Sequence, residues 1–537
     1  MKKMMKKLIA MAAALVMIVT LLPAVGVKAQ TDNPEETLST TIDFSKTGTL
    51  NIYKYDGDDK TTPVQGAGFT LYPIYLFNED GSGAVVRANV NRTTYNDLED
   101  FINKTTEEQK EIAATLAGVV SQATIDEEKT TNAAGYVNFD ELQLGIYLVK
   151  ETTAPGQYVA SAPFLVSIPA ADNADDSNDN TAETPATGWN YTVTARPKNE
   201  KVTIDKDITE VNDEDMLDGS KAEAGVGDTV EYTITSVAPT YTDEYFTEGG
   251  ATKDPVYTIS DTLSTGLTLI SKNNEEDVTN TGIKVYIGQS ATELTENKDY
   301  TITLAANEGD PSFKVTFTKT FLQNNTYKGQ KVTVVYRAEV NENAVVGAGN
   351  NNNVILDYTN KPNSDTKAEP GTVPKVYTYG LKLTKKAAGE NGELLDGAEF
   401  KLYKVEGQNE IPITNLKGMV DGKLTTKNGL ITFSGLATGT YRLEEVKAPD
   451  DYTLLADKIE FTITDTEIDG IPEISTEGFA VEMVDGKGTG YVTTTVVNNK
   501  GFSLPATGGM GTYLFTIGGI VIMAGAAFAL IAMKKRA

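Results

Sequence analysis

The stretch Tyr147-Leu-Val-Lys-Glu-Thr-Thr-Ala-Pro155 returns later in the chain as Tyr441-Arg-Leu-Glu-Glu-Val-Lys-Ala-Pro449. Upstream of the two copies, Leu50-Asn-Ile-Tyr-Lys54 corresponds to Leu381-Lys-Leu-Thr-Lys385. An internal repeat of this length is unlikely to arise by chance and indicates two related domains, one toward each end of the chain.

Short runs rich in Thr, Val, Ile and Tyr, separated by Gly, Asn and Asp, make up most of the sequence, as in Val230-Glu-Tyr-Thr-Ile-Thr-Ser-Val237. This pattern predicts an all-β fold built from immunoglobulin-like β-sandwiches. The exception is the segment 96–122, whose polar and apolar spacing and Thr105-Thr-Glu-Glu108 start predict one or two helices inserted into the first domain.

Both ends of the chain carry targeting signals. Met1-Lys-Lys-Met-Met-Lys-Lys7 is basic, an apolar run follows, and Val27-Lys-Ala29 resembles a small-residue cleavage site, so residues 1–29 are predicted to be a signal peptide. At the other end, the apolar run Tyr513–Met533 is long enough to cross a bilayer as a helix, and the cations Lys534-Lys-Arg536 would stop on the cytoplasmic side. The body of the protein is therefore predicted to lie outside the cell.

About 470 residues lie between these signals, which is too many for one core and suits roughly three domains. The predicted bounds are 30–199, 200–374 and 375–503, followed by the sorting region 504–537.

Composition excludes several kinds of chemistry. The chain has no cysteine and no histidine, so disulfides, Cys-ligated zinc, Cys or Ser-His nucleophiles and imidazole catalysis are absent. A net charge of −28 argues against nucleic acid as a partner. No cofactor is expected, and the acidic stretch Asp172–Asn180 lacks the Gly and the terminal Glu of an EF-hand, so we predict a loop there rather than a calcium site.

The repeats place ionisable side chains on the apolar face of strands. Because side chains alternate along a strand, Lys54 shares a face with Leu50 and Ile52, and Glu151 shares one with Tyr147 and Val149. The same parity predicts that Lys385 and Glu445 point into the core of the last domain.

Burial favours a neutral lysine and a protonated acid, that is, a nucleophile beside a group that can polarise a carbonyl. The last strand of each repeat offers an asparagine of matching parity as the electrophile, Asn199 in the first and Asn498 in the last. Asn499 is the competing acceptor in the last domain, disfavoured by its parity with Val497.

The middle segment has no second copy of the repeat, but parity gives it a similar set. Lys206 shares a face with Ile204, Asp261 with Ile259, and Asn360 with Tyr358. Asn353 lies on the opposite face and is the alternative acceptor.

The repeated YxLxExxAP pattern resembles the E-box of Cna-B-type domains of Gram-positive adhesins and pilins. In that family, a Lys attacks an Asn side-chain amide beside the E-box Glu and ammonia is lost. The resemblance implies the isopeptide bonds Lys54–Asn199 and Lys385–Asn498, with Glu151 and Glu445 in the catalytic role; the middle segment resembles a Cna-A-type domain and implies Lys206–Asn360 with Asp261. The alternative for each set is a plain buried ion pair or, in the middle domain, a surface lysine.

Trp189-Asn-Tyr-Thr-Val193-Thr-Ala-Arg-Pro197-Lys198 resembles the pilin motif WxxxVxVYPK, with Ala195 and Arg196 as the departures. If Asn199 faces the core, its neighbour Lys198 faces away from it. In the family this lysine attacks a subunit tail that a sortase holds as a thioester.

The tail itself resembles the LPXTG sorting signal, which a sortase cleaves between Thr507 and Gly508. The five recognised residues are Leu504, Pro505, Ala506, Thr507 and Gly508. Joining Thr507 of one copy to Lys198 of the next would give a covalent head-to-tail fibre, a heterologous arrangement that does not close.

The resemblance thus implies the backbone subunit of a cell-wall-anchored pilus, with no enzymatic activity beyond forming its own cross-links. Its implied partners are identical subunits, pilin-class and housekeeping sortases, accessory pilins, peptidoglycan and host surface ligands. The alternative is a monomeric wall-anchored adhesin that binds host matrix, and the two differ in whether Lys198 accepts another subunit.

Overall fold

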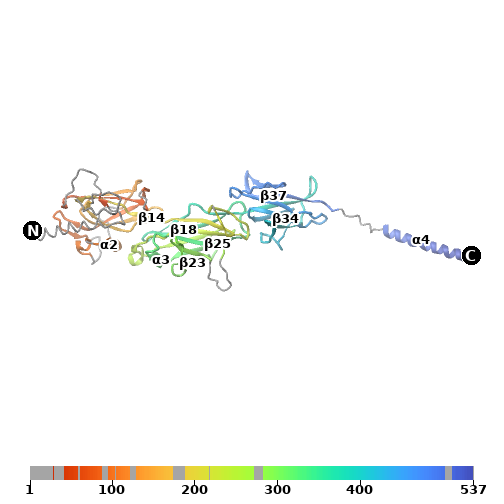
Figure 1. Cartoon of the computed structure of the whole chain (residues 1–537), viewed down its shortest axis with the longest axis horizontal. Coiled ribbons are helices and arrows are strands. Elements are labelled where there is room, and N and C mark those ends of the chain that lie inside the picture. The colour runs from red at the N-terminus through yellow and green to blue at the C-terminus, as the bar shows by residue number, and fades with distance from the viewer. Residues whose placement is uncertain are drawn as a thin grey trace. The chain divides into compact units, whose positions relative to one another are not determined.

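A computed structural model describes residues 28–29, 41–57, 61–87, 95–102, 104–120, 128–172, 188–216, 218–270, 282–501 and 511–535, without the side chains at 28–29, 172, 199–200, 511–515 and 532. Most of the predicted signal peptide, the acidic stretch after Asp172 and the sorting motif 504–508 lie outside these residues. The chain divides into two compact units, one formed by 1–345 with 349–377 and the other by 346–348 with 378–537 (Figure 1).

The first β-sandwich occupies residues 41–201. Its elements are β2 (Gly48–Tyr53), β3 (Tyr55–Asp56), β4 (Gly68–Phe77), β5 (Gly83–Val85), η1 (Leu98–Asp100), α2 (Thr106–Val119), β6 (Lys129–Thr130), β7 (Tyr136–Leu142), β8 (Gly145–Thr153), β9 (Tyr158–Val159), β10 (Phe164–Ile168), β11 (Ala170–Asp172), β12 (Gly188–Asn190), β13 (Thr192–Ala195) and β14 (Lys198–Lys201).

Two sheets, β1-β13-β2-β7 and β10-β8-β4-β5, form the layers of this domain. A third, smaller sheet has the strand order β3-β14-β9. Strand β1 (Lys28–Ala29) pairs with β13. It lies within the predicted signal peptide, so after cleavage at that site the first sheet would consist of β13, β2 and β7. The core contains Leu50 and Ile52 from β2, as alternation along the strand predicts.

The predicted helical insertion is present as η1 and α2. Thr105 and Glu108 form a capping box at the start of α2: the Thr105 hydroxyl accepts from the Glu108 amide, and the Glu108 carboxylate accepts from the Thr105 amide. Helix α2 buries Ile112, Ala113 and Leu116, and it packs against β8 and β10.

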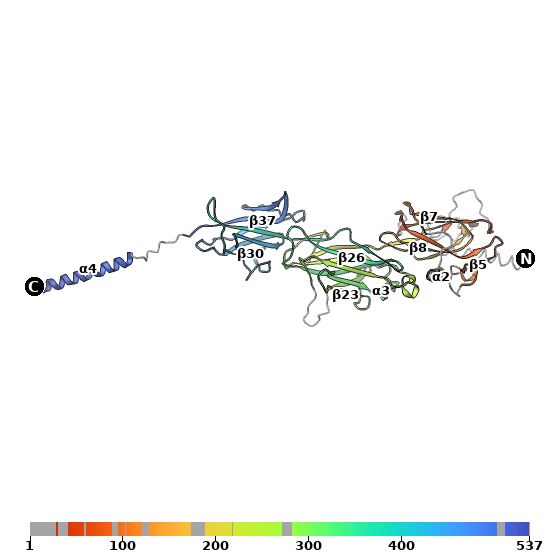
Figure 2. The same cartoon turned by 180° about the vertical axis from the view of Figure 1, so that it is seen from behind.

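The middle β-sandwich belongs to the same compact unit as the first. Figure 2 labels its strands β23 and β26 and its helix α3. Its elements are β15 (Ile204–Val211), β16 (Glu214–Asp215), β17 (Lys221–Glu223), β18 (Thr229–Val237), η2 (Asp243–Tyr245), η3 (Thr247–Gly249), β19 (Tyr257–Leu263), β20 (Leu267–Leu269), β21 (Lys284–Ile287), β22 (Thr292–Glu293), β23 (Tyr300–Leu304), β24 (Phe313–Phe317), α3 (Lys319–Gln323), β25 (Lys331–Val340), β26 (Asn350–Lys361), β27 (Ser364–Ala368) and β28 (Lys375–Tyr377).

Two seven-stranded sheets face each other in this domain. The first strand, β15, lies in one sheet, whereas β19 and β26 are neighbours in the other. A side chain from β15 therefore meets side chains from β19 and β26 across the core rather than along one sheet.

The third β-sandwich lies in the second compact unit. Its elements are β29 (Tyr379–Ala387), β30 (Glu399–Glu406), β31 (Asn409–Ile413), β32 (Leu424–Thr425), β33 (Leu430–Leu436), β34 (Gly439–Lys447), β35 (Ile459–Ile463), β36 (Phe479–Val484) and β37 (Lys487–Asn498), followed by α4 (Gly511–Lys534).

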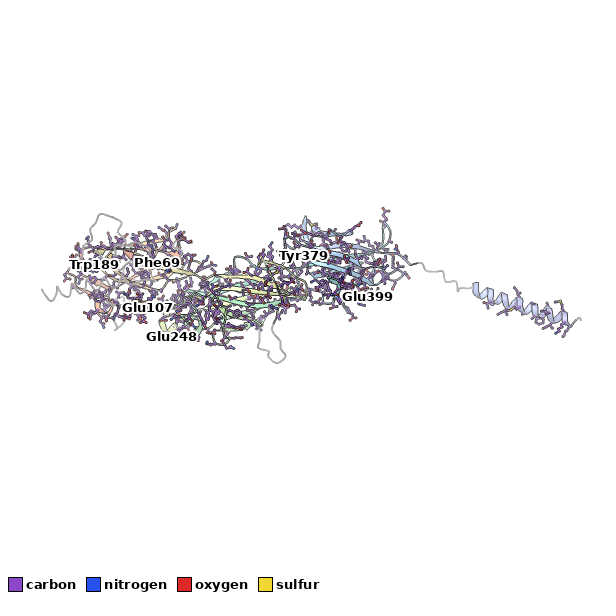
Figure 3. All side chains as sticks on the ribbon, viewed as in Figure 1. Phe69, Glu107, Trp189, Glu248, Tyr379 and Glu399 are labelled. Carbon is purple, nitrogen blue, oxygen red and sulfur yellow. The ribbon has the colours of Figure 1, made fainter. Side chains whose placement is uncertain are left out.

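Its first and last strands, β29 and β37, are parallel neighbours, just as β2 and β13 are in the first domain. In Figure 3, Phe69 and Trp189 mark the first sandwich, and Tyr379 and Glu399 mark the third. The all-β prediction is confirmed, and so is the structural relation between the two repeats.

Across the side chains that the structure describes, which in α4 are 516–531 and 533–535, no helix is both long enough and apolar enough to span a membrane.

Candidate cross-linking sites

The third domain brings an amine, a carboxamide and a carboxylate together in its core. Lys385 on β29, Asn498 at the end of β37 and Glu445 on β34 are all buried. The Lys385 Nζ contacts Asn498 Oδ1 and lies 3.3 Å from Glu445 Oε1. Asn498 Nδ2 donates to Glu445 Oε1 at 3.0 Å, so the carboxylate reaches both the amine and the amide nitrogen.

The register of β29 with β37 explains why Lys385 and Asn498 lie side by side. In the parallel ladder, Lys385 lies opposite Val496, and Asn498 lies opposite Ala387, two residues farther along. Asn498 and Val496 therefore share the buried face, whereas Asn499 is exposed, as parity predicts. The backbone amide of Leu455 donates to Glu445 Oε2 and fixes the carboxylate. Burial lowers the pKa of Lys385, more than the neighbouring Glu445 raises it.

In the first domain, Lys54 and Glu151 form the equivalent pair. Their side chains are fully buried, with Lys54 Nζ 2.8 Å from Glu151 Oε2. The backbone amide of Ser161 donates to the same oxygen at 2.7 Å, in the place that Leu455 takes in the third domain. Burial lowers the pKa of Lys54, and the nearby Glu151 charge opposes this only in part.

The side chain of Asn199 lies outside the described residues, but its backbone register is informative. Asn199 lies opposite Asp56 in the parallel pair β14·β3, which is two residues beyond Lys54. Asn498 stands in the same relation to Lys385. The backbone thus carries Asn199 to the position that corresponds to the acceptor of the third domain.

In the middle domain, Lys206 and Asp261 meet between the two sheets. Both side chains are fully buried, and Lys206 Nζ contacts Asp261 Oδ2. Burial lowers the pKa of Lys206 to about 8, against the opposing charge of Asp261. Burial also raises the pKa of Asp261, with Lys206 opposing the shift. The rings of Tyr232 and Tyr336 lie 5.2 and 5.4 Å from the amine.

The asparagine that joins this pair is Asn352 rather than Asn360. Asn352 Nδ2 donates to the Tyr336 hydroxyl at 2.7 Å, and that hydroxyl donates to Asp261 Oδ2 at 3.0 Å. The Asn352 side chain is fully buried, and its Oδ1 has no hydrogen-bond partner among the described residues.

Asn360, the predicted acceptor, lies elsewhere. On β26, Val354 lies opposite Asp261, so Asn352 is two residues from that level and Asn360 is six residues away on the other side. Six residues span about 20 Å of strand. Asn360 Nδ2 instead donates to the carbonyl of Ala154 in the first domain, at 3.4 Å. Asn353 is exposed, on the face that parity assigns to it.

Parity therefore specifies a face of β26 but not a position along it. Asn352, Val354, Leu356, Tyr358 and Asn360 all share that face, and the alternation alone cannot choose between its two ends. Only the antiparallel register of β26 with β19 makes the choice, and that register depends on both strands.

The pilin-like motif lies at the end of the first domain, along β12, β13 and the start of β14. Trp189, Val193 and Pro197 are buried, whereas Lys198 at the start of β14 is exposed. Strand β14 lies between β3 and β9. The exposed lysine thus stands on a strand that is paired on both sides.

Lys198 lines a cavity of about 150 Å³ that the sequence did not predict. One wall is α2, through Gln109, Lys110 and Ala113, and the other is the segment 161–165. Gln109 Oε1 and Ser161 Oγ are buried there, and neither has a hydrogen-bond partner in the part of the chain that the structure describes.

Comparisons with known proteins match both repeats and the C-terminal end of the chain. Residues 48–182 and 380–477 match a family of prealbumin-like fold domains, and residues 496–537 match the LPXTG cell wall anchor motif. The type 1 fimbrial subunit of Actinomyces viscosus is 25% identical over 94% of this chain and 93% of its own length. The type 2 fimbrial subunit of Actinomyces naeslundii is 26% identical over 73% of this chain and 70% of its own.

Solved structures show the same relation. The full-length major pilin SpaD from Corynebacterium diphtheriae superposes with a TM-score of 0.53 at 25% identity, covering 86% of this chain and 99% of that one. The T6 backbone pilin of Streptococcus pyogenes, at 18% identity, shares the fold with a TM-score of 0.56 over 86% of this chain and all of that one.

The protein is accordingly a cell-wall-anchored surface subunit that polymerises into the backbone of a pilus, and its C-terminal tail is only a transient membrane anchor. Comparisons of sequence and of structure lead to the same family: the chain belongs to the sortase-assembled major pilins of Gram-positive bacteria.

Proposed function

We propose that each of the three domains closes itself with one Lys–Asn isopeptide bond. The bonds are Lys54–Asn199, Lys206–Asn352 and Lys385–Asn498. The observation that carries the proposal is the contact of the Lys385 amine with the side-chain amide of Asn498 in a buried site.

The chemistry in the third domain follows from these contacts. The neutral Lys385 Nζ attacks Cγ of Asn498, the new N–C bond forms, and the Cγ–Nδ2 bond breaks to release ammonia. One proton must pass from Nζ to Nδ2. Glu445 lies within 3.3 Å of the first and 3.0 Å of the second, so it can take the proton from one nitrogen and give it to the other.

In the middle domain the relay includes a tyrosine. Asp261 contacts the amine, and the Tyr336 hydroxyl links Asp261 to the Asn352 amide nitrogen. The proton would pass from Lys206 through Asp261 and Tyr336 to the leaving nitrogen. Replacing Tyr336 by Phe should therefore slow this bond alone, which the intact mass of newly made protein reports.

Replacing Glu445 by Ala tests the catalytic role. Peptide mapping of the wild-type ectodomain should recover a branched peptide that joins Lys385 to Asn498, and the variant should lack it. The matched control is Glu444→Ala on the other face of the same strand, where Glu444 accepts from the Tyr403 hydroxyl. A branched peptide that persists in Glu445→Ala would refute the assignment.

We further propose that Lys198 accepts the tail of the next subunit. A pilin-class sortase would hold the Thr507 carbonyl as a thioester; the Lys198 amine attacks that carbonyl, an amide forms, and the sortase thiol leaves with the proton. The exposure of Lys198, directly after the buried Pro197, supports this role.

Lys198→Ala should abolish the high-mass ladders that cell-wall extracts give on denaturing gels. Lys201→Ala at the other end of β14 is the matched control and should leave the ladders unchanged. Accessory pilins and host ligands, which the family resemblance implies, stay predictions.

A further inference from the structure

The two walls of the Lys198 cavity are both attached to the middle domain. We propose that the middle domain is part of the acceptor site: through η2, η3 and the end of β26, it holds α2 and the segment 160–165 in the positions at which Lys198 can react. This inference rests on the proposed role of Lys198 as acceptor.

The first attachment is a backbone contact at the end of α2. A Cβ on Gly118, in the last turn of the helix, would lie 2.6 Å from the backbone carbonyl oxygen of Gly249 in η3. Such a separation is too short for a carbon atom, so the absence of a side chain allows the helix to meet η3 directly. Helix α2 also packs against η2.

The second attachment is electrostatic and lies beside the first. Lys150 on β8 donates to the carbonyl of Ala117 at 2.8 Å, where the helix dipole is negative, and its ammonium lies 4.0 Å from Glu244 Oε2 of η2. Glu244 is buried, and Lys150 is its ion-pair partner within the described residues. The carboxylate of the middle domain thus lies near the cation that caps α2.

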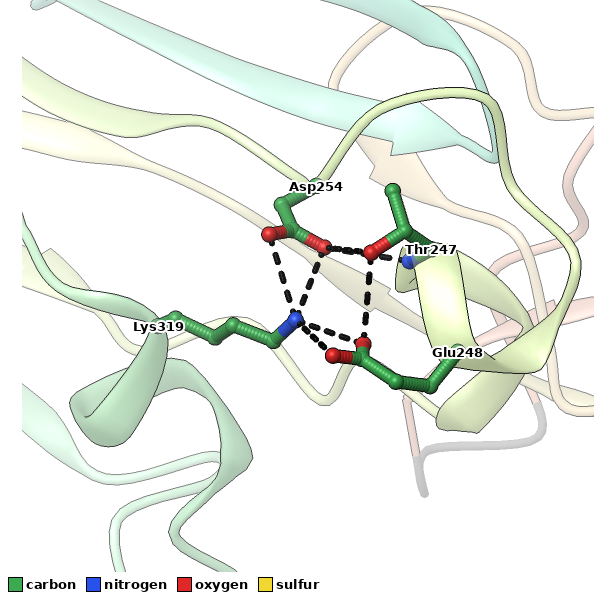
Figure 4. A network of polar contacts seen from close by, with 4 residues as sticks. All are labelled: Thr247, Glu248, Asp254 and Lys319. Carbon is green, nitrogen blue, oxygen red and sulfur yellow. Dashed lines mark hydrogen bonds and ion pairs between the residues drawn. The ribbon is translucent and has the colours of Figure 1, made fainter.

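The η3 turn is itself fixed within the middle domain (Figure 4). Lys319 at the start of α3 donates to Glu248 at 2.6 Å and to Asp254 at 3.1 Å, and the Thr247 hydroxyl donates to Asp254 at 3.0 Å. These contacts connect η3 to α3 from two sides. The surface that meets α2 is therefore anchored to the sandwich behind it.

The opposite wall of the cavity is attached through the end of β26. The amide of Ala160 donates to the carbonyl of Asn360 at 2.9 Å. The Tyr245 hydroxyl lies 3.3 Å from the carbonyl of Ala160 and 3.2 Å from that of Asn360, so it can donate to either. Ser161, the next residue, lines the cavity. The start of this wall, at Ala160, is therefore hydrogen-bonded to residues of the middle domain.

The cavity needs both walls at once. Residues of α2 and of the 161–165 segment line it together with Pro197 and Lys198. The space beside Lys198 therefore depends on the position of both segments. A shift of about 1 Å in one wall can cost a reaction up to about a hundredfold in rate.

The test uses the full-length ectodomain as acceptor, a pilin-class sortase and a synthetic Leu-Pro-Ala-Thr-Gly peptide as donor. The rate of adduct formation at Lys198, located by peptide mapping, gives kcat and KM for the acceptor. Gly118→Ala adds a methyl group that must push α2 away from η3, although alanine itself favours the helix over glycine. Thr115→Ala, at an exposed position of the same helix, is the matched control.

We expect Gly118→Ala to lower kcat/KM about tenfold and to speed amide hydrogen exchange in α2, with the three internal bonds retained. Tyr245→Phe removes only a hydroxyl at the other wall and should also lower kcat/KM. If Gly118→Ala folds poorly, Tyr245→Phe alone serves as the test. Rates equal to wild type in both variants would overturn the inference. An adduct that still forms in Lys198→Arg at another lysine would instead refute Lys198 as acceptor, and the inference with it.

Discussion

At the scale of the residue, alternation along strands predicted which lysines are buried. Lys54, Lys206 and Lys385 all lie in cores beside the predicted carboxylates. Alternation has a period of two, so it fixes the face of a residue but not its position along the strand. Asn498, at the end of β37, lies beside Lys385 in the structure, whereas on the long buried face of β26 the predicted Asn360 lies away from Asp261 and Asn352 lies near it.

Two substitutions separate the candidate acceptors of the middle domain. Asn352→Ala removes the amide that the Tyr336 hydroxyl contacts, so the ectodomain should keep one more ammonia in its intact mass than wild type does. Asn360→Ala should leave the mass loss of wild type unchanged, because its amide donates to Ala154 instead. The reverse pattern would restore Asn360 as the acceptor.

The stability of Asn352→Ala, which cannot form the bond to Lys206, should also depend on pH in a way that the stability of the cross-linked protein does not. In Asn352→Ala the Lys206 amine is free, and its pKa is lowered from 10.5 to about 8 in the folded state. Between these two values the unfolded chain binds the additional proton, so the free energy of unfolding that this group contributes rises with pH.

We therefore expect the stability deficit of Asn352→Ala relative to wild type to narrow as the pH rises from about 8 to about 10.5. Urea unfolding of both proteins at matched pH measures the deficit. A deficit that stays constant over this range would show that Lys206 does not titrate there.

At the scale of the element, local signals predicted strands and the inserted helix well. The capping box needs only the four adjacent residues that begin at Thr105, and the structure contains both of its hydrogen bonds. The contacts of α2 with η2 and η3 could not be read from the sequence, because they join segments that are more than a hundred residues apart and depend on a glycine and a buried ion pair. The sequence also could not predict that Lys206 on β15 faces Asp261 on β19 and Asn352 on β26 across the core, because β15 belongs to one sheet and the other two strands to another.

Removing the helix cap should loosen α2 locally. Thr105→Ala deletes the hydroxyl that accepts from the Glu108 amide, at a cost of about 1 kcal/mol. Amide hydrogen exchange in the first turn of α2 should become faster, while the β-sheets keep their protection. Thr115→Ala, in the same helix but away from the cap, serves as control; equal exchange in the two variants would argue against the capping box.

At the scale of the whole molecule, the sequence predicted a secreted, wall-anchored chain of three sandwiches. In the third domain the proposed bond joins the first strand, β29, to the last, β37, and its two residues, Lys385 and Asn498, are separated by 113 residues. By analogy with disulfides, closing such a loop stabilises a domain by about 4 kcal/mol. An amide cannot be reduced, so the chain gains this closure without cysteine.

The intact mass of the purified ectodomain, combined with peptide mapping, tests the central claim most directly. We predict a mass lower than that of the unmodified sequence by three molecules of ammonia, with branched peptides at Lys54–Asn199, Lys206–Asn352 and Lys385–Asn498. A mass equal to that of the unmodified sequence, with all three lysines recovered in linear peptides, would contradict it.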